Sequence, residues 1–173
     1  MKYFKVSSGR IVISDPCYKD VEPIQAINGK WLGEVELNHH NRIRKLTVQH
    51  SDYILNPKFD NVMHTESAVD SGQLGVFDSK SYRNDKLVVN LPRLCNQSIC
   101  EDEPWYSICC DRTLSENNCG YVPEGFLSSS GYGDGFYQTK VFLVDNKAVA
   151  VEIEFIEEDE EDQDSDYYED EEN

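Results

Sequence analysis

The sequence predicts a mainly β fold, an antiparallel sandwich or half-barrel with one short helix and a disordered acidic C-terminal tail. Apolar and polar residues alternate over residues 31–37, 43–50 and 149–155, as is typical of strands with one buried face. Only one segment has helical spacing, and Gly, Asn, Asp and Pro separate the others. A chain of 173 residues has room for one ordinary domain. We expect that domain to cover residues 1–156.

Two short β-type runs at the N-terminus, residues 3–6 and 10–14, flank the sequence Ser7-Ser8-Gly9. This pattern predicts a first hairpin. Pro16 ends the second run, because proline lacks the N–H group that a strand ladder needs. A second hairpin is predicted from residues 31–37 and 43–50, joined by a polar turn.

The one helix candidate is residues 104–114. Three acidic residues precede Pro104, where they favour the positive end of the helix dipole, and proline is tolerated in the first helical turn. Trp105, Ile108, Cys109 and Arg112 follow helical spacing. These signals predict a short helix lying on an antiparallel sheet.

A last hairpin is predicted from residues 138–144 and 147–156. Asp145-Asn146 joins them, and both residue types tolerate the positive φ angles of a tight type I′ turn. On the second run, Val149, Val151, Ile153 and Phe155 share one face, which we expect to be buried; Ala148, Ala150, Glu152 and Glu154 share the face that we expect to be exposed.

The charge of the chain is concentrated at its C-terminus. Residues 157–173 hold twelve of the 33 acidic residues and none of the 16 basic ones. Like-charge repulsion and the lack of apolar residues predict a disordered tail. Such a tail either keeps the protein soluble or acts as an arm, which docks on a basic partner or imitates a nucleic-acid backbone.

The sequence favours a cytoplasmic protein with no membrane segment. No run approaches the roughly 20 apolar residues that span a bilayer, and the first eight residues are too short and polar for a signal peptide. Direct nucleic-acid binding by the body is disfavoured because Lys and Arg are not clustered; residues 42–45 are the one basic stretch. We expect a protein partner, with the acidic arm suited to a basic one.

Five of the six cysteines lie between Cys95 and Cys119. Without a signal peptide, reduced and mostly buried thiols are favoured over a disulfide framework. The C-x2-C pair typical of structural zinc sites is absent, which makes zinc the weaker alternative. We predict no cofactor and no metal.

Three polar segments, residues 14–18, 69–78 and 128–135, combine carboxylates with small residues that let backbone approach a partner. They match neither the phosphate-binding loop G-x-x-x-x-G-K-[ST] nor a calcium hand. In the third segment we expect positive φ angles or a close backbone approach at residues 131–135. The candidate ligand- or partner-binding residues are Asp15, Cys17, Tyr18, Asp70, Ser71, Gln73, Asp78, Ser130, Tyr132 and Asp134.

The segments SDPCY, VDSGQLGVFD and SSSGYGDGFY, with the WY-x-x-x-C-x-x-T pattern formed by Trp105, Tyr106, Cys110 and Thr113, resemble a family of uncharacterised proteins of bacteria and their phages. The resemblance covers about residues 8–156 and excludes the tail. It implies a β-rich fold that shares these loops. It supplies no activity.

Three interpretations of the loops remain open. The aspartates cap turns through Asx-type hydrogen bonds, or the loops gather at one end of the sandwich as a binding pocket or patch, or they form an enzyme site. The enzyme would use Cys17 as nucleophile, His50 as base and Asp70 to orient it. Alternatively, a divalent cation would bind to the carboxylates of Asp15, Asp70, Asp78 and Asp134.

The leading functional hypothesis is a small intracellular accessory or interaction protein of phage or bacterial origin that binds a partner or a small ligand. No G-x-S-x-G, H-E-x-x-H or kinase pattern signals a known catalytic site. The alternative is a hydrolase-like enzyme with a site built from Asp15, Cys17, Asp70, Asp78 and Asp134.

Overall fold

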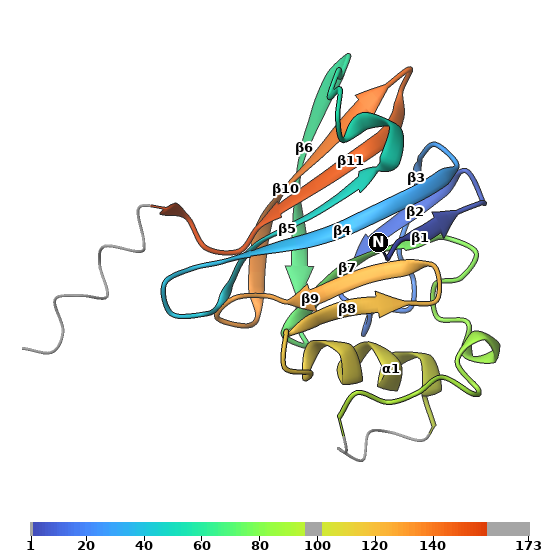
Figure 1. Ribbon diagram of the computed structural model, residues 1–173, viewed down its shortest axis with the longest axis vertical. Helices are drawn as coiled ribbons and strands as arrows, with labels where there is room; N and C mark the ends of the chain where they lie inside the picture. Colours follow the sequence, from blue (N-terminus) through green and yellow to red (C-terminus); the bar gives the residue numbers. More distant parts are fainter. Residues whose placement is uncertain (1, 96–101, 159–173) are drawn as a thin grey trace, which may run out of the picture.

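The computed structural model describes residues 2–95 and 102–158. Within these ranges the protein is mainly β, with two open antiparallel sheets and one α-helix, which confirms the predicted fold class (Figure 1). The predicted disorder of the acidic tail concerns residues that lie almost wholly outside the described ranges. No helix in the described part of the chain is long and apolar enough to cross a membrane.

The larger sheet has six strands in the order β1-β4-β5-β11-β10-β6. Each neighbouring pair is antiparallel. The strands are β1 (Phe4–Val6), β4 (Gly29–Leu37), β5 (Ile43–His50), β6 (Asn61–Val69), β10 (Gly135–Val144) and β11 (Lys147–Glu154).

The smaller sheet has five strands in the order β3-β2-β7-β9-β8 and carries the helix on its outer side (Figure 1). Its strands are β2 (Arg10–Ser14), β3 (Ile24–Gln25), β7 (Gln73–Asp78), β8 (Cys119–Val122) and β9 (Gly125–Ser129). The helix is α1 (Pro104–Thr113), and two single 3₁₀ turns are η1 (Ser51–Tyr53) and η2 (Asp85–Leu87).

The second and the last predicted hairpins and the helix are confirmed. β4 pairs with β5, and β10 pairs with β11. Asp145 and Asn146 have φ angles of 50° and 61°, as the type I′ turn requires. The expected exposed face of β11 is wrong at its start: Ala148 and Ala150 are buried. The backbone beside β3 covers Ala148, since the N–H of Ile27 donates to its carbonyl oxygen (3.1 Å).

The predicted first hairpin is wrong, because β1 and β2 belong to different sheets. The N–H groups of Ser7 and Ser8 donate to the Asp78 carboxylate at 2.6 and 2.9 Å. Gly9 then turns the chain with a φ of 71°. These contacts carry the chain from one layer of the sandwich to the other.

Residues 73–78, predicted as part of a polar loop, form the central strand β7, and every residue of it is buried. Gly75 permits this packing, since a Cβ atom there would lie 2.5 Å from the Leu127 Cβ of β9. The segments of β6, β8 and β9 were likewise not predicted as strands, and Ser128 and Ser129 belong to β9.

The smaller sheet separates two hydrophobic cores. The first lies between the sheets and includes Trp31, Leu46, Val151, Leu74 and Phe126. The second lies between the smaller sheet and α1 and includes Phe77, Leu127, Trp105, Ile108 and Cys109. The fold therefore has three layers, which are sheet, sheet and helix.

Truncation of Ile108 tests this second core. The side chain is 2% exposed, so we expect Ile108→Ala to lower the free energy of unfolding by about 2–5 kcal/mol. Leu87 is 41% exposed, so Leu87→Ala should stay within about 0.5 kcal/mol. Urea unfolding followed by circular dichroism measures both, and equal effects would contradict the layered core.

Candidate functional site

All the predicted site residues except Asp78 gather at one end of the smaller sheet. The pairs Ser14↔Gly75 and Gln73↔Ser129 place the end of β2, the start of β7 and the end of β9 at one edge. Residues 15–18, 70–72 and 130–134 continue from those strand ends. We call this cluster of three loops the motif end.

Asp15 connects the first two loops. Its carboxylate is fully buried and accepts four hydrogen bonds: from the Cys17 N–H (2.9 Å), the Asp70 N–H (2.8 Å), the Ser71 N–H (2.7 Å) and the Ser71 hydroxyl (2.5 Å). Tyr18 closes the same turn by donating its N–H to the Asp15 carbonyl oxygen (3.1 Å). A buried charge is tolerated only when it is paired or hydrogen-bonded in this way.

Asp134 connects the third loop to the second. Its carboxylate accepts a hydrogen bond from the Gly72 N–H at 2.9 Å, and the Ser130 N–H donates to the Gly72 carbonyl oxygen at 3.0 Å. Gly131 and Gly133 have φ angles of 66° and 119°, which confirms the positive φ expected in this loop. Ser130 is buried, and its hydroxyl donates to the Gly133 carbonyl oxygen (2.7 Å).

Gln73 connects the motif end to α1. Its buried amide accepts from the Thr113 hydroxyl at 3.0 Å and donates toward the Cys110 Sγ at 3.4 Å and the Ser71 Oγ at 3.2 Å. Cys110 and Thr113 lie three residues apart on one helix face. Trp105 packs instead in the second core. Thus two of the four residues of the WY-x-x-x-C-x-x-T pattern, Cys110 and Thr113, meet the other motifs.

Asp78 does not belong to this cluster. It pairs with Ile11 at the opposite end of β7, about 17 Å along the strand from Gln73 at 3.4 Å per residue. Its buried carboxylate accepts from the N–H groups of Ser7, Ser8 and Lys80. A site that shares Asp78 with Asp15 is therefore excluded by geometry.

The two forms of the enzyme site lack the arrangement they need. No group of three His, Cys, Asp or Glu residues suited to a metal ion occurs in residues 2–95 and 102–158. Burial and the neighbouring Asp15 raise the pKa of Cys17 to about 12, which keeps the thiol neutral. His50 contacts the Asn28 carbonyl oxygen (3.1 Å), and the Asn28 side chain accepts from the Gly9 N–H, just before β2 begins. Cys17 follows the other end of β2, so the proposed base and the proposed nucleophile lie at opposite ends of this strand.

The cysteines of the described ranges are free thiols, but they are less buried than expected. Cys109 alone among them is buried, and the others are half-buried. Cys100 lies outside the described residues. Cys109 packs in the core under α1, while Cys17 and Cys110 lie at the motif end.

A polar pocket of about 530 Å³ opens beside the third loop. Its walls come from the β4–β5 turn, the second and third loops and the end of α1. The lining residues are His40, Asn41, Arg42, Ile43, Gly72, Thr113, Leu114, Asn118, Ser129, Gly131, Tyr132 and Gly133. We call it the loop pocket. Within residues 2–95 and 102–158, no carboxylate lines it, although the whole chain has a net charge of −17.

The β4–β5 turn is fixed against the third loop. The Asn38 side chain accepts from the N–H groups of His40 and Arg42 (3.0 and 2.9 Å) and donates to the Tyr132 hydroxyl (3.4 Å). The Arg42 guanidinium lies 5.8 Å from the centre of the Tyr132 ring, within range of a cation–π contact. The turn therefore holds a positive charge at the pocket wall.

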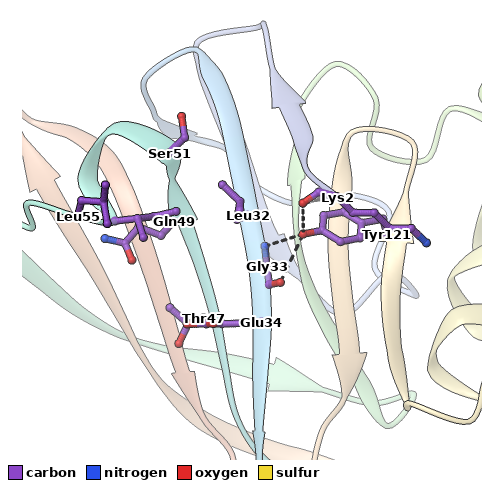
Figure 2. Close-up of a pocket in the computed structure, with 10 residues that line it drawn as sticks. Lys2, Leu32, Gly33, Glu34, Thr47, Gln49, Ser51, Leu55 and Tyr121 are labelled. Carbon is purple, nitrogen blue, oxygen red and sulfur yellow. Dashed lines mark hydrogen bonds between the residues drawn. The ribbon is translucent and has the colours of Figure 1, made fainter.

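A second recess, of about 640 Å³, is more apolar and lies over β4 and β5 (Figure 2). The Tyr121 hydroxyl accepts from the Gly33 N–H (3.0 Å) and donates to the Lys2 carbonyl oxygen (3.0 Å), closing one side of it (Figure 2). Leu55, on the opposite side, is 96% exposed. No residue of the sequence motifs lines this recess.

Sequence reasoning missed Arg42, His40 and Asn38 as site residues. The polar turn was predicted, but its docking on Tyr132 depends on a contact between residues 94 positions apart. The basic stretch at residues 42–45 was the available signal. It was interpreted as an ordinary strand.

Comparisons with protein-family models, with curated proteins and with solved structures found no match. The resemblance to bacterial and phage proteins therefore stays a prediction. The function has to be argued from the geometry of the site.

Replacing Asp15 tests its role as the connection between the loops. Asp15→Asn keeps the shape but loses acceptor capacity, and it leaves buried N–H or O–H groups without a full partner. We expect a loss of at least about 1–3 kcal/mol in the free energy of unfolding. Asp20→Asn, at an exposed position, is the control. A stable Asp15→Asn variant would show that the loops hold together without the charge.

The pKa of Cys17 predicts slow alkylation. At pH 8.5 a thiol of pKa about 12 is a thiolate roughly a hundredfold to a thousandfold less often than one at the ordinary value near 9. Because the folded-state pKa is raised, the associated stability is present below pH 9 and is lost as the pH rises toward 12. Iodoacetamide labelling with peptide mass spectrometry measures the rate, and labelling as fast as in urea would contradict the assignment.

Proposed function

We propose that this chain is a small intracellular accessory protein that acts by binding a partner protein or a small ligand at the loop pocket. The observation that carries the proposal is the meeting of four separate sequence motifs at one end of the fold, beside a pocket of about 530 Å³. Such a volume falls in the ordinary range of ligand sites, about 300–1,000 Å³.

The lining chemistry supports a polar ligand group with negative charge. Arg42 supplies a permanent positive charge, His40 an imidazole ring, and Asn41, Thr113 and Asn118 supply hydrogen-bonding side chains. At Gly133 a Cβ atom would meet nothing within 4 Å, so this glycine leaves the backbone of the third loop uncovered at the pocket. An anionic group would meet a charge-assisted donor at Arg42.

The roles of the aspartates support binding over turnover. Asp15 and Asp78 are buried and accept hydrogen bonds from backbone N–H groups, which leaves them to hold loops in place. Cys17 keeps its proton at neutral pH. A rigid pocket built on such loops suits recognition, for which preorganised groups lower the ordering cost.

The acidic arm adds a second contact to the proposal. Twelve acidic residues in 157–173 suit a partner with a basic surface, through steering and charge complementarity. We propose no direct contact of the body with nucleic acid. The resemblance to phage and bacterial proteins suggests a bacterial lysate as the source of the partner.

Neutralising Arg42 tests the pocket. We expect Arg42→Gln to reduce retention of the bound partner or ligand about tenfold, the effect of losing one charge-assisted hydrogen bond. The measurement is affinity capture on tagged full-length chain from a bacterial lysate, followed by native mass spectrometry for small ligands and protein identification. Since Arg42 is exposed, the free energy of unfolding should not change.

Lys147→Gln is the matched control, because Lys147 is an exposed cation at the far end of β11. It should retain the same molecules as the natural chain. Equal retention by all three chains, or no specific retention by any, would contradict a binding role for this pocket.

A further inference from the structure

β6 lies at the edge of the larger sheet, beside β10 (Figure 1). The other edge strands of the described part of the chain, β1, β3 and β8, have three, two and four residues, whereas β6 has nine. Short strands, lysine, proline and β-bulges commonly protect a sheet edge against pairing with another chain. Residues 61–69 contain no lysine or proline and pair with β10 without a bulge. The edge of β6 therefore lacks these protections.

The backbone groups at this edge belong to the even-numbered residues of β6. The Phe155 N–H donates to β5, and backbone direction alternates from residue to residue, so the even residues of β11 face β10. The registers of β11 with β10 and of β10 with β6 carry this alternation across the sheet. The Val62 N–H accordingly donates to the side chain of its neighbour and not to β10. The N–H and C=O groups of His64, Glu66 and Ala68 also point outward, and within residues 2–95 and 102–158 no hydrogen-bond partner meets them.

The surface beside this edge is accessible. Residues 63–66 are exposed, although their side chains point alternately to the two faces of the sheet. Next to residues 66–68 lies an open groove of about 440 Å³, and residues 13–14 and 18–21 line its other side. An added strand therefore has room along the outer edge of β6.

The sequence of the edge is complementary to itself. When two copies of β6 pair antiparallel about a twofold axis at Thr65, His64 of each copy lies opposite Glu66 of the other, and Val62 lies opposite Ala68. A histidine can donate a hydrogen bond to the glutamate, and two threonines facing each other are a favourable cross-strand pair. An axis at residue 66 would place two glutamates opposite each other, which is destabilising, and an axis at residue 64 would place Glu66 opposite Val62. Self-pairing is therefore favoured in one register.

We propose that two copies of this chain pair antiparallel through their β6 edges, with the twofold axis at Thr65, and so join their larger sheets into one. The same surface patch serves both copies, as a closed twofold dimer requires. This inference goes beyond the proposed function, because no residue of β6 lines the loop pocket. The dimer would present two loop pockets and two acidic arms to a partner, which raises avidity without any new contact.

A charge exchange across the axis tests the dimer. Sedimentation equilibrium of the full-length chain over a concentration series should show a monomer–dimer equilibrium. We expect His64→Glu, which places two acids opposite each other at both ends, to raise the dissociation constant at least about tenfold. Glu66→Lys should also weaken the dimer, and the double variant His64→Glu with Glu66→Lys should restore it to within about threefold. Both side chains are exposed, so urea unfolding should show folded variants of unchanged stability.

A disulfide at the axis tests the register. Thr65 would face its own copy as a non-hydrogen-bonded pair, with Cα atoms about 4.5 Å apart, which a disulfide can bridge. With oxidised glutathione as the oxidant, full-length Thr65→Cys should form a covalent dimer joined at position 65, identified by peptide mass spectrometry. Asn61→Cys is the matched control on the same strand and face. In this register the two positions 61 would stand about 27 Å apart, eight residues at 3.4 Å each, and should stay unlinked.

Three results would overturn the inference. A natural chain that stays monomeric up to about 1 mM has no such interface. Equal dimerisation by all four chains would place the contact elsewhere on the molecule, and so would a loss in the single variants that the double variant does not reverse. A link at position 61 in place of position 65 would contradict the register. The loop pocket is tested separately, because Arg42→Gln should leave the dimer unchanged, and failed capture with an intact dimer would overturn only the proposed function.

Discussion

The arrangement of the motif end depends on the buried carboxylate of Asp15. A charge without solvent must be surrounded by donors, and here the donors come from its own turn and from a loop more than 50 residues away. Satisfying Asp15 fixes Ser71, which places Gly72. The Gly72 N–H then donates to the Asp134 carboxylate, and this hydrogen bond positions the third loop. The pocket wall is thus the last link in a series of hydrogen bonds that begins at Asp15.

Buried aspartates accept hydrogen bonds from distant backbone N–H groups at two other places in the fold. Asp78 accepts the N–H groups of Ser7 and Ser8 where the chain passes between the sheets. Asp111, buried on α1, accepts those of Leu94 and Cys95. Backbone hydrogen bonds from Cys95 and Leu94 hold the pKa of Asp111 below its usual range against the opposing effect of burial. These buried aspartates of the body therefore hold separate chain segments together by accepting hydrogen bonds from their backbone N–H groups.

Sequence patterns predicted the elements that have one exposed face and missed those that have none. β4, β5 and α1 were found because solvent on one side imposes a period of two or 3.6 residues. β7 and β9 lie between the larger sheet and α1, so both faces are buried and no alternation marks them. At the site, acids and glycines of the loops could be predicted from local turn chemistry. Arg42 could not, because its role depends on Tyr132, 90 positions later.

Gly131 connects the loop pocket to the residues just beyond the end of β11 through close packing. A Cβ atom at this position would lie 3.1 Å from both the Ile43 carbonyl oxygen and the Ile156 Cγ1. The third loop thus packs against the start of β5 and against Ile156, just beyond the end of β11. A side chain at position 131 would therefore displace either the Ile43 backbone or Ile156, and Gly131 lines the pocket. The tight contact leaves little room for the two features to move independently.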